Sequence, residues 1–390
     1  MTKRMSPAIL LTVLTASGAS AQQQVSKIDD AGTLHLPDGE IIPYSDLASP
    51  EARKNFIDST RGYEAVMTKP ANWKPKAGET AGDQERRWYD EVLYIPWLSK
   101  LRHRFVVVIE PKKIGRVQAD IIYPPEGVSD NNKERVLINL HGGGMLVGAR
   151  YSGQLESIPI SSIGRIRVVT VDYRMLPHKY PAAEEDVIAV YRELLKTYRP
   201  ENIGIYGCSA GASLTGRAVA RLIASGQPKP GAIGMFGYGP FGHRGDGDSN
   251  YIFSGGEPIL RPDSYTAGVD MDNRASYPIE AREIQRQFPP SLLISGTRDL
   301  GLSRVVFAHS VLVDLGVDAE LHVWEGVQHC SFAQPFVDPD VPETQHAWKT
   351  IIKFFDNHLG RSGRQADGSK SATEKVADVR PRGEMNARQR

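Results

Sequence analysis

From Arg104 onward the chain alternates short apolar runs with longer helical patterns. The apolar runs have the length and β-branched content of strands buried on both faces, and they lie at 135–140, 167–173, 203–207, 231–237, 290–296 and 319–326. A weak helical pattern follows the first run, and stronger patterns predict helices at 182–198, 210–224, 303–315 and 343–359. Such alternation is typical of βαβ units, so the sequence predicts an α/β fold with a mostly parallel sheet.

Two further β-rich runs precede this region. "RFVVVIE" and "RVQADIIYP" are separated by the turn-like "PKKIG" and predict a hairpin. We place the α/β domain at 104–360. Two segments do not fit its alternation: the polar 22–103, with helical stretches at 50–67 and 83–100, and the Gly- and Asp-rich insertion at about 238–288. We expect both to form a cap over the carboxyl edge of the sheet. The last segment, 361–390, has almost no large apolar side chains and should be disordered.

The first 21 residues have the pattern of a signal peptide. Lys3 and Arg4 precede a short apolar run, and Ala19-Ser20-Ala21 has the small-x-small form of a cleavage site. The run is shorter than the roughly 20 residues that span a bilayer, so no membrane span is predicted. We expect cleavage near Ala21 and a secreted or periplasmic protein. The alternatives are a lipid anchor or the start of a core helix.

The charge and composition of the chain limit the classes of binding partner that we expect. The formal net charge is +1, with 40% apolar and 24% charged residues, so nothing steers the protein toward nucleic acid or an anionic membrane. No phosphate-binding Lys-Ser/Thr follows the Gly-rich loop, and the loop itself does not have the G-x-G-x-x-G pattern, which argues against phosphate binding there. We expect no cofactor and no metal. The expected partner is a small-molecule substrate. The sequence leaves the oligomeric state open.

The stretch "IYGCSAG" at 205–211 joins a predicted strand directly to a helix. That context is required of a nucleophile elbow, in which the central residue of Gly-x-Ser-x-Gly is exposed at a strained turn. Gly207 and Gly211 are small because the strand and helix backbones nearly touch there. The pattern therefore predicts Ser209 as the nucleophile, with Cys208 the weaker alternative.

A second motif, "HGGGM", begins at His141 directly after the strand at 135–140. Its glycines leave backbone N–H groups able to face an oxygen that becomes negatively charged, and each such donor is worth about 3–4 kcal/mol in acyl transfer. We predict an oxyanion hole from the amides of Gly142, Gly143, Gly144 and Ala210, the last because it begins a helix. The other interpretation of such a loop is phosphate binding.

The base and its orienting acid should follow the serine in the order Ser, acid, His. Asp299 lies in the loop after the strand at 290–296, and His329 lies in the loop after the next strand. His309 in a helix, His322 in a strand and His243 in the insertion are weaker candidates for the base. In the predicted chemistry His329 takes the proton of Ser209 and returns it to the leaving alkoxide, while Asp299 orients the ring.

Taken together, these motifs resemble the hormone-sensitive-lipase-like esterases of the α/β-hydrolase fold. The resemblance runs from about Arg104 to Leu359 and rests on "HGGG", "VDYR", "YPAAEED", "GCSAG" and the Asp299 and His329 loops. It implies an eight-stranded, mostly parallel sheet with a cap, and hydrolysis of short- to medium-chain acyl esters without a cofactor. The "GTRD" loop looks most like a branch with lactone and small-ester hydrolases. The chain departs from the family in having Cys208 where Asp is usual and Ala212 where a second Gly is usual.

We therefore predict a serine hydrolase acting on carboxylic esters through an acyl-enzyme. Amide or formamide cleavage by the same residues is the alternative, and a non-catalytic binding protein on this fold is a third possibility.

The two cysteines, Cys208 and Cys330, adjoin Ser209 and His329. Either they pair, which requires Cα atoms within about 7 Å, or both are small buried apolar residues, the commoner fate of cysteine. Asp172 and Arg174 should brace loops, and the aromatic residues of the insertion should either pack the cap or form an apolar substrate wall; these are Tyr238, Phe241, Tyr251, Phe253 and Tyr265.

Overall fold

A computed structural model describes residues 27–36, 39–67, 69–70, 73–241, 265–333 and 335–360, with backbone alone at 63–67. The predicted signal peptide and C-terminal tail lie outside the described residues, as do His243, Tyr251 and Phe253 of the insertion. The described residues belong to one compact unit.

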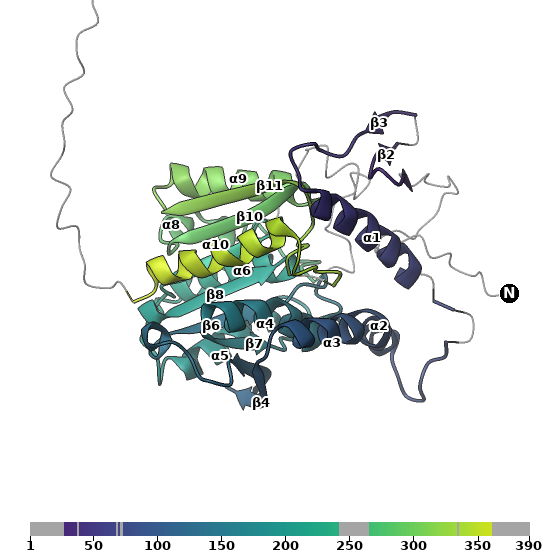
Figure 1. Ribbon diagram of the computed structural model, residues 1–390. Coiled ribbons are helices and arrows are strands. Elements are labelled where there is room, and N and C mark those ends of the chain that lie inside the picture. Colours follow the sequence, from purple (N-terminus) through teal and green to yellow (C-terminus); the bar gives the residue numbers. More distant parts are fainter. Residues whose placement is uncertain are drawn as a thin grey trace, which may run out of the picture. The chain divides into compact units, whose positions relative to one another are not determined.

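The unit is built on an eight-stranded sheet (Figure 1). Its strands are β4 (Val108–Ile114), β5 (Val117–Tyr123), β6 (Val136–Leu140), β7 (Arg167–Val171), β8 (Ile203–Cys208), β9 (Ala232–Phe236), β10 (Ser291–Arg298) and β11 (Ala319–Gln328), in the spatial order β11-β10-β9-β8-β6-β7-β5-β4. All neighbours pair in parallel except β4 with β5 and β5 with β7. The predicted mostly parallel α/β sheet is confirmed.

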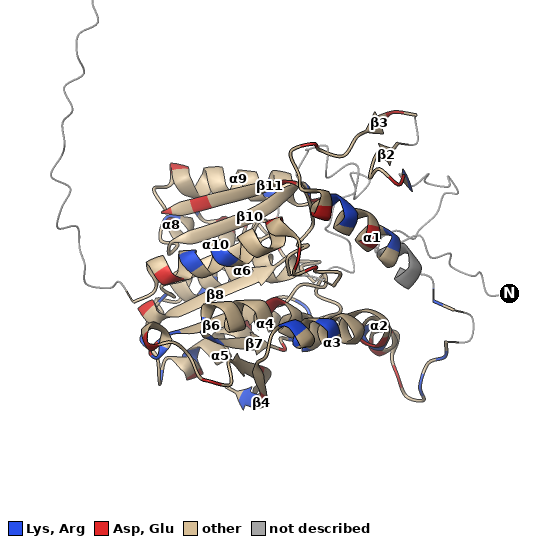
Figure 2. Ribbon diagram, viewed as in Figure 1, with Lys and Arg blue, Asp and Glu red and all other residues tan. Residues whose placement is uncertain are grey.

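Helices bury both faces of this sheet, which is why its central strands are continuously apolar. One face packs against α4 (Tyr151–Gly164) and α10 (Pro342–His358). The other packs against α5 (Ala182–Leu194), α6 (Ala210–Ala224) and α9 (Leu302–Asp314). The central strands β6, β8 and β9 carry no charged residue, and Figure 2 shows the acidic and basic residues mainly on the surrounding helices and loops.

Most expected elements are found, with shifted boundaries. The hairpin is confirmed as β4 and β5, but "PKKI" continues β4, and the turn is at Gly115 and Arg116, both with positive φ. The helix expected at 83–100 is longer: α2 (Ala81–Tyr89), a π-helical segment η1 (Asp90–Tyr94) and α3 (Ile95–Arg104) follow one another. Helix α5 ends earlier than expected. Short elements complete the unit: the 3₁₀ turns η2 (Asp130–Asn132), η3 (Pro200–Asn202) and η4 (Pro278–Glu280), and α8 (Arg282–Gln285).

The N-terminal segment packs against the end of the sheet that carries β10 and β11. It forms a small antiparallel sheet of β1 (Lys27–Ile28), β2 (Leu34–His35) and β3 (Ile41–Ile42), followed by α1 (Pro50–Met67), which contacts β11 and α10. The buried Arg298 guanidinium donates to the carbonyls of Gly32, Ile42 and Pro43 and lies 4.6 Å from the ring centroid of Tyr44. The residue just before Asp299 thus anchors this segment. None of the described helices has the length and apolar content to cross a bilayer.

The order of the strands determines where a ligand can bind. The chain leaves β6 toward β7 on one side, whereas β8 lies on the other side of β6. Such a reversal opens a crevice at the carboxyl ends of the two strands, where α/β proteins bind their ligands. The HGGG loop follows β6 and Ser209 follows β8, so both predicted motifs lie at this switch point.

Candidate active site

Ser209 lies at a sharp turn between β8 and α6. Its backbone has φ 58° and ψ −118°, a left-handed conformation that is strained for a residue with a side chain. The turn is held in place because the Ser209 amide donates to the Phe236 carbonyl at 2.8 Å. The strain projects the hydroxyl away from the sheet, as the predicted elbow requires.

The flanking glycines make this turn possible. A Cβ at residue 211 would collide with the Leu140 carbonyl oxygen. A Cβ at residue 207 would meet the same oxygen and would lie 2.6 Å from the Gly211 carbonyl carbon. Glycine is therefore required at 207 and 211 because strand β8, helix α6 and the end of β6 meet at backbone contact. This is the reason that the sequence pattern suggested.

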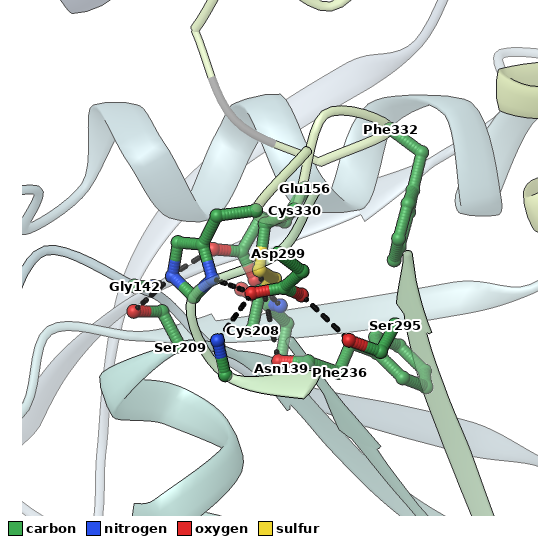
Figure 3. The surroundings of a disulfide bond; sticks show 12 residues. Asn139, Gly142, Glu156, Cys208, Ser209, Phe236, Ser295, Asp299, Cys330 and Phe332 are labelled. Carbon is green, nitrogen blue, oxygen red and sulfur yellow. Dashed lines mark hydrogen bonds and ion pairs between the residues drawn. A yellow bond between two sulfur atoms is a disulfide. The ribbon is translucent and has the colours of Figure 1, made fainter. Parts of the chain in front are cut away.

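The structure brings Ser209, His329 and Asp299 into one hydrogen-bonded chain (Figure 3). His329 Nε2 is 2.8 Å from Ser209 Oγ, and His329 Nδ1 is 2.7 Å from Asp299 Oδ1. A carboxylate only accepts hydrogen bonds, so Nδ1 donates to Asp299 and Nε2 is left to accept from the serine hydroxyl. This is the arrangement in which an imidazole can remove the serine proton.

Asp299 is buried and fixed by neutral donors. It is 1% exposed, and its Oδ2 accepts from Ser295 Oγ at 2.9 Å while Oδ1 also accepts from the Gly301 amide at 2.7 Å. The carboxylate therefore has one orientation toward the imidazole. The other described candidate bases are elsewhere: His309 on α9 and His322 on β11 have no contact with Ser209.

The HGGG loop contributes fewer free amides than we expected. The Gly142 amide donates to Glu156 Oε1 at 2.8 Å, so it is not available to an oxyanion, and its predicted role is wrong. Among the described residues, the amides of Gly143 and Gly144 have no acceptor. Gly143 has φ 110°, and a Cβ there would collide with the Val147 carbonyl oxygen, so only glycine fits. Ala210 is the first residue of α6, where the helix supplies no acceptor for its N–H.

His141 fixes the orientation of the next peptide. It is fully buried, and its Nδ1 is 2.6 Å from the Gly142 carbonyl oxygen. Burial lowers the pKa of His141 to about 4, so the ring is neutral near pH 7 and Nδ1 carries the proton that reaches this carbonyl. Tyr173 stacks on the ring at 4.3 Å between centroids and donates to the His141 carbonyl at 2.6 Å. The loop is thus held by buried side chains.

Comparison with known proteins agrees with this fold. Residues 137–333 match the family model described as alpha/beta hydrolase fold, which is half of the chain. The chain belongs to the α/β-hydrolase family. Among solved structures, the hydrolase is similar to an esterase named E25, with 28% identity, a TM-score of 0.61 and coverage of 82% of this chain and 98% of that one. It is also similar to an esterase of the bacterial hormone-sensitive lipase family, with 25% identity, a TM-score of 0.64 and coverage of 80% and 99%.

A curated relative of this hydrolase is the carboxylesterase/phospholipase LipF of Mycobacterium tuberculosis, which is 28% identical over 253 residues. That alignment spans 60% of this chain and 65% of the relative's length. The expected resemblance to hormone-sensitive-lipase-type proteins of the α/β-hydrolase fold is confirmed.

The hydrolase pairs its two cysteines beside the site. Cys208 and Cys330 form a disulfide with their Cα atoms 6.3 Å apart, and both are buried. Of the two alternatives that the sequence leaves open, the structure has the disulfide rather than two free buried cysteines. Because Cys208 precedes Ser209 and Cys330 follows His329, the bond ties the nucleophile turn to the histidine loop (Figure 3). With its sulfur in a disulfide, Cys208 is not a thiol nucleophile.

Glu156 was not found from the sequence. It lies on α4, is 3% exposed, and accepts from the Gly142 amide and from Asn139 Nδ2, each at 2.8 Å. Burial raises the pKa of Glu156 to about 8, although hydrogen bonds from Asn139, Gly142 and Cys208 oppose that rise. One signal was available: a single acid within the otherwise uncharged stretch from Tyr151 to Gly164.

The remaining predicted residues pack the structure. Arg174 donates to Asp186 and to the Ala182 carbonyl, so it braces the loop before α5 as expected. Burial raises the pKa of Asp172 to about 6. Among the described aromatic residues of the insertion, Tyr265 donates to Glu184 and Phe241 stacks edge-on against Phe307, which favours the packing interpretation.

Proposed function

We propose that this hydrolase cleaves carboxylic esters by way of an acyl-enzyme on Ser209. The observation that carries the proposal is the continuous hydrogen-bonded chain from Ser209 Oγ through the His329 imidazole to the buried Asp299. Further support comes from relatives named as esterases or carboxylesterases.

The chemistry depends on the donors and acceptors present. His329 Nε2 takes the hydroxyl proton while Ser209 Oγ attacks the carbonyl carbon, and the carbonyl oxygen becomes an oxyanion. The amides of Gly143, Gly144 and Ala210 stabilise that charge. When the tetrahedral state collapses, the C–O bond to the alcohol breaks and His329 returns the proton to the departing alkoxide. A water molecule then attacks the acyl-enzyme by the same route and releases the acid and free Ser209.

We propose short- to medium-chain acyl esters, or small lactone and aryl esters, as the substrate class. The support is the similarity to hormone-sensitive-lipase-type esterases. The same residues are chemically able to cleave an amide or formamide, which differs mainly in the poorer leaving group. Comparing p-nitrophenyl acetate with the matching p-nitroanilide separates the two: faster turnover of the anilide would assign amide cleavage instead.

Replacing Ser209 tests the nucleophile. For Ser209→Ala we expect kcat on p-nitrophenyl acetate to fall by about 10⁴- to 10⁶-fold and labelling by a fluorophosphonate probe to disappear. Ser213→Ala is the matched control, because Ser213 lies one turn further along α6 and donates to the Gly239 carbonyl at 3.0 Å. Undiminished ester turnover after Ser209→Ala would refute the proposal. A wild-type protein that neither turns over esters nor reacts with the probe would favour a binding protein.

We also propose that the protein is exported and that its leader is cleaved near Ala21. A disulfide between the two cysteines supports this, because such bonds persist in oxidising compartments. Intact-mass measurement of the protein from the periplasm or medium tests it: a mature chain that still begins at Met1 would contradict cleavage.

A further inference from the structure

Glu156 is a buried acid, and the packing of apolar side chains does not explain why an acid lies at this position. Its carboxyl group accepts from Asn139 Nδ2 and from the Gly142 amide, each at 2.8 Å. Among the described residues it has no cationic partner. Burying an acid without a counter-charge costs free energy, so a cluster of this kind points to a role beyond packing.

Close helix packing brings Glu156 to this place. Gly153 lies one turn earlier on α4, and a Cβ there would collide with Thr170 Oγ1 on β7 and lie 3.4 Å from Asn139 Oδ1 on β6. The missing side chain therefore lets α4 approach the sheet closely. Thr170 Oγ1 donates to Asn139 Oδ1 at 2.8 Å, which orients the Asn139 amide toward Glu156. A buried polar chain thus runs from β7 through β6 to α4.

The contact with Gly142 matters because, together with the His141 contact, it holds the residue whose carbonyl sets the direction of the Gly143 N–H. Glu156 fixes the N–H of Gly142, and His141 Nδ1 fixes its carbonyl. A peptide unit is planar and trans, so fixing the Gly142 carbonyl fixes the N–H of Gly143 in the opposite direction. That N–H is one of the free amides assigned to the oxyanion.

We propose that Glu156 is a positioning residue that locks the HGGG loop to the end of β6. Its carboxyl group joins the Gly142 amide to Asn139 on β6 and, together with His141, sets how the Gly143 N–H faces Ser209 (Figure 3). This inference rests on the proposed function, because it assigns Glu156 to the same reaction. Glu156 does not itself touch the substrate.

Glu156→Gln tests the proposal with almost no change in volume. Both carboxyl oxygens of Glu156 accept a bond from an N–H donor, whereas glutamine has one acceptor oxygen and its NH₂ group would face one of those donors. We expect kcat on p-nitrophenyl acetate to fall about 10- to 100-fold, less than the roughly 10²- to 10³-fold that accompanies complete loss of an oxyanion donor. KM should change little, because the ground-state ester depends weakly on that donor.

The deciding measurement is inhibition by a trifluoromethyl ketone, which adds reversibly to the serine hydroxyl and places an oxyanion in the hole. Its Ki should rise in Glu156→Gln by the same factor as kcat falls. Ser161→Ala is the matched control: Ser161 lies on the same helix as Glu156, and its buried hydroxyl donates to the Ile122 and Ile166 carbonyls rather than to Glu156 or Gly142, so kcat and Ki should stay within about 2-fold of wild type.

The outcomes separate this proposal from the proposed function. An inert wild-type protein would overturn the function. An active wild type together with an unchanged kcat and Ki in Glu156→Gln would overturn the role of Glu156 alone. Equal losses in Ser161→Ala and Glu156→Gln would also overturn it, because they would reflect general loosening of α4. If Glu156→Gln does not fold, Glu156→Asp carries the test: its shorter side chain retracts the carboxylate, and kcat and inhibitor affinity should again fall in parallel.

Discussion

Breaking the Cys208–Cys330 bond should cost this hydrolase much of its stability. The bond joins residues 122 positions apart in the sequence, so it removes a large amount of conformational freedom from the unfolded chain. The chain-entropy relation for a loop of this length gives about 16 cal/mol/K, or about 4.9 kcal/mol at 25 °C. Since folded domains are stable by only about 5–15 kcal/mol, reduction should be plainly measurable.

The assay is urea unfolding monitored by circular dichroism, with and without dithiothreitol. We expect a strong downward shift of the wild-type midpoint under reducing conditions. The sequence has no other cysteine, so the double variant Cys208→Ala/Cys330→Ala should start near the reduced wild type and should not respond to dithiothreitol. This variant separates loss of the bond from other effects of the reductant.

The same treatment should lower activity, because the bond connects the turn of Ser209 with the loop of His329. We expect kcat to fall on the order of 10-fold on reduction, as the imidazole and hydroxyl lose their fixed separation. An unchanged urea midpoint in protein whose two thiols are titratable after reduction would refute the stabilising role of the bond. Two free thiols in unfolded protein before any reductant is added would show that the bond does not form.

The site and its surroundings give three more testable expectations. Asp299→Asn should lower kcat by about 10⁴-fold, because an amide NH₂ facing His329 Nδ1 favours the tautomer with the proton on Nε2. Steady-state kinetics measures this loss, and a loss below 10-fold would contradict the expectation. Gly237→Ala should destabilise more than Gly226→Ala: both residues have φ near 65°, but a Cβ at 237 would lie 2.5 Å from Cys330 Sγ, whereas nothing lies within 4 Å of one at 226. The difference should be about 1–3 kcal/mol in urea unfolding, and equal losses would rule out the clash. Burial lowers the pKa of His141 to about 4, so the folded state binds fewer protons than the unfolded state between pH 6.5 and 4. The free energy of unfolding should therefore fall by up to about 3 kcal/mol as the pH falls through that range. His141→Asn should flatten this part of the pH dependence of the urea midpoint, and an unchanged slope would assign it to other groups.

The sequence by itself determined most elements of this protein and the candidate residues for its reaction. The β8 and α6 boundaries at Ser209 could be predicted because a strand runs directly into a helix with glycine on both sides of the turn. Asp299 and His329 could be predicted because carboxyl ends of parallel strands meet at one edge, so a residue's place just after a strand locates it in space.

The tertiary structure decided what depends on contacts between distant segments. Whether Cys208 bonds to Cys330 depends on the distance between two loops. Because the cysteines adjoin Ser209 and His329, the sequence limits this distance but does not determine it. The sequence places Gly142 in the glycine-rich loop. Only the close packing of α4 against the sheet at Gly153 shows that the Gly142 N–H already donates to Glu156. Periodicity reports which face of a helix is buried, whereas the partner of one buried polar atom is set by the packing of whole elements, which no local pattern encodes.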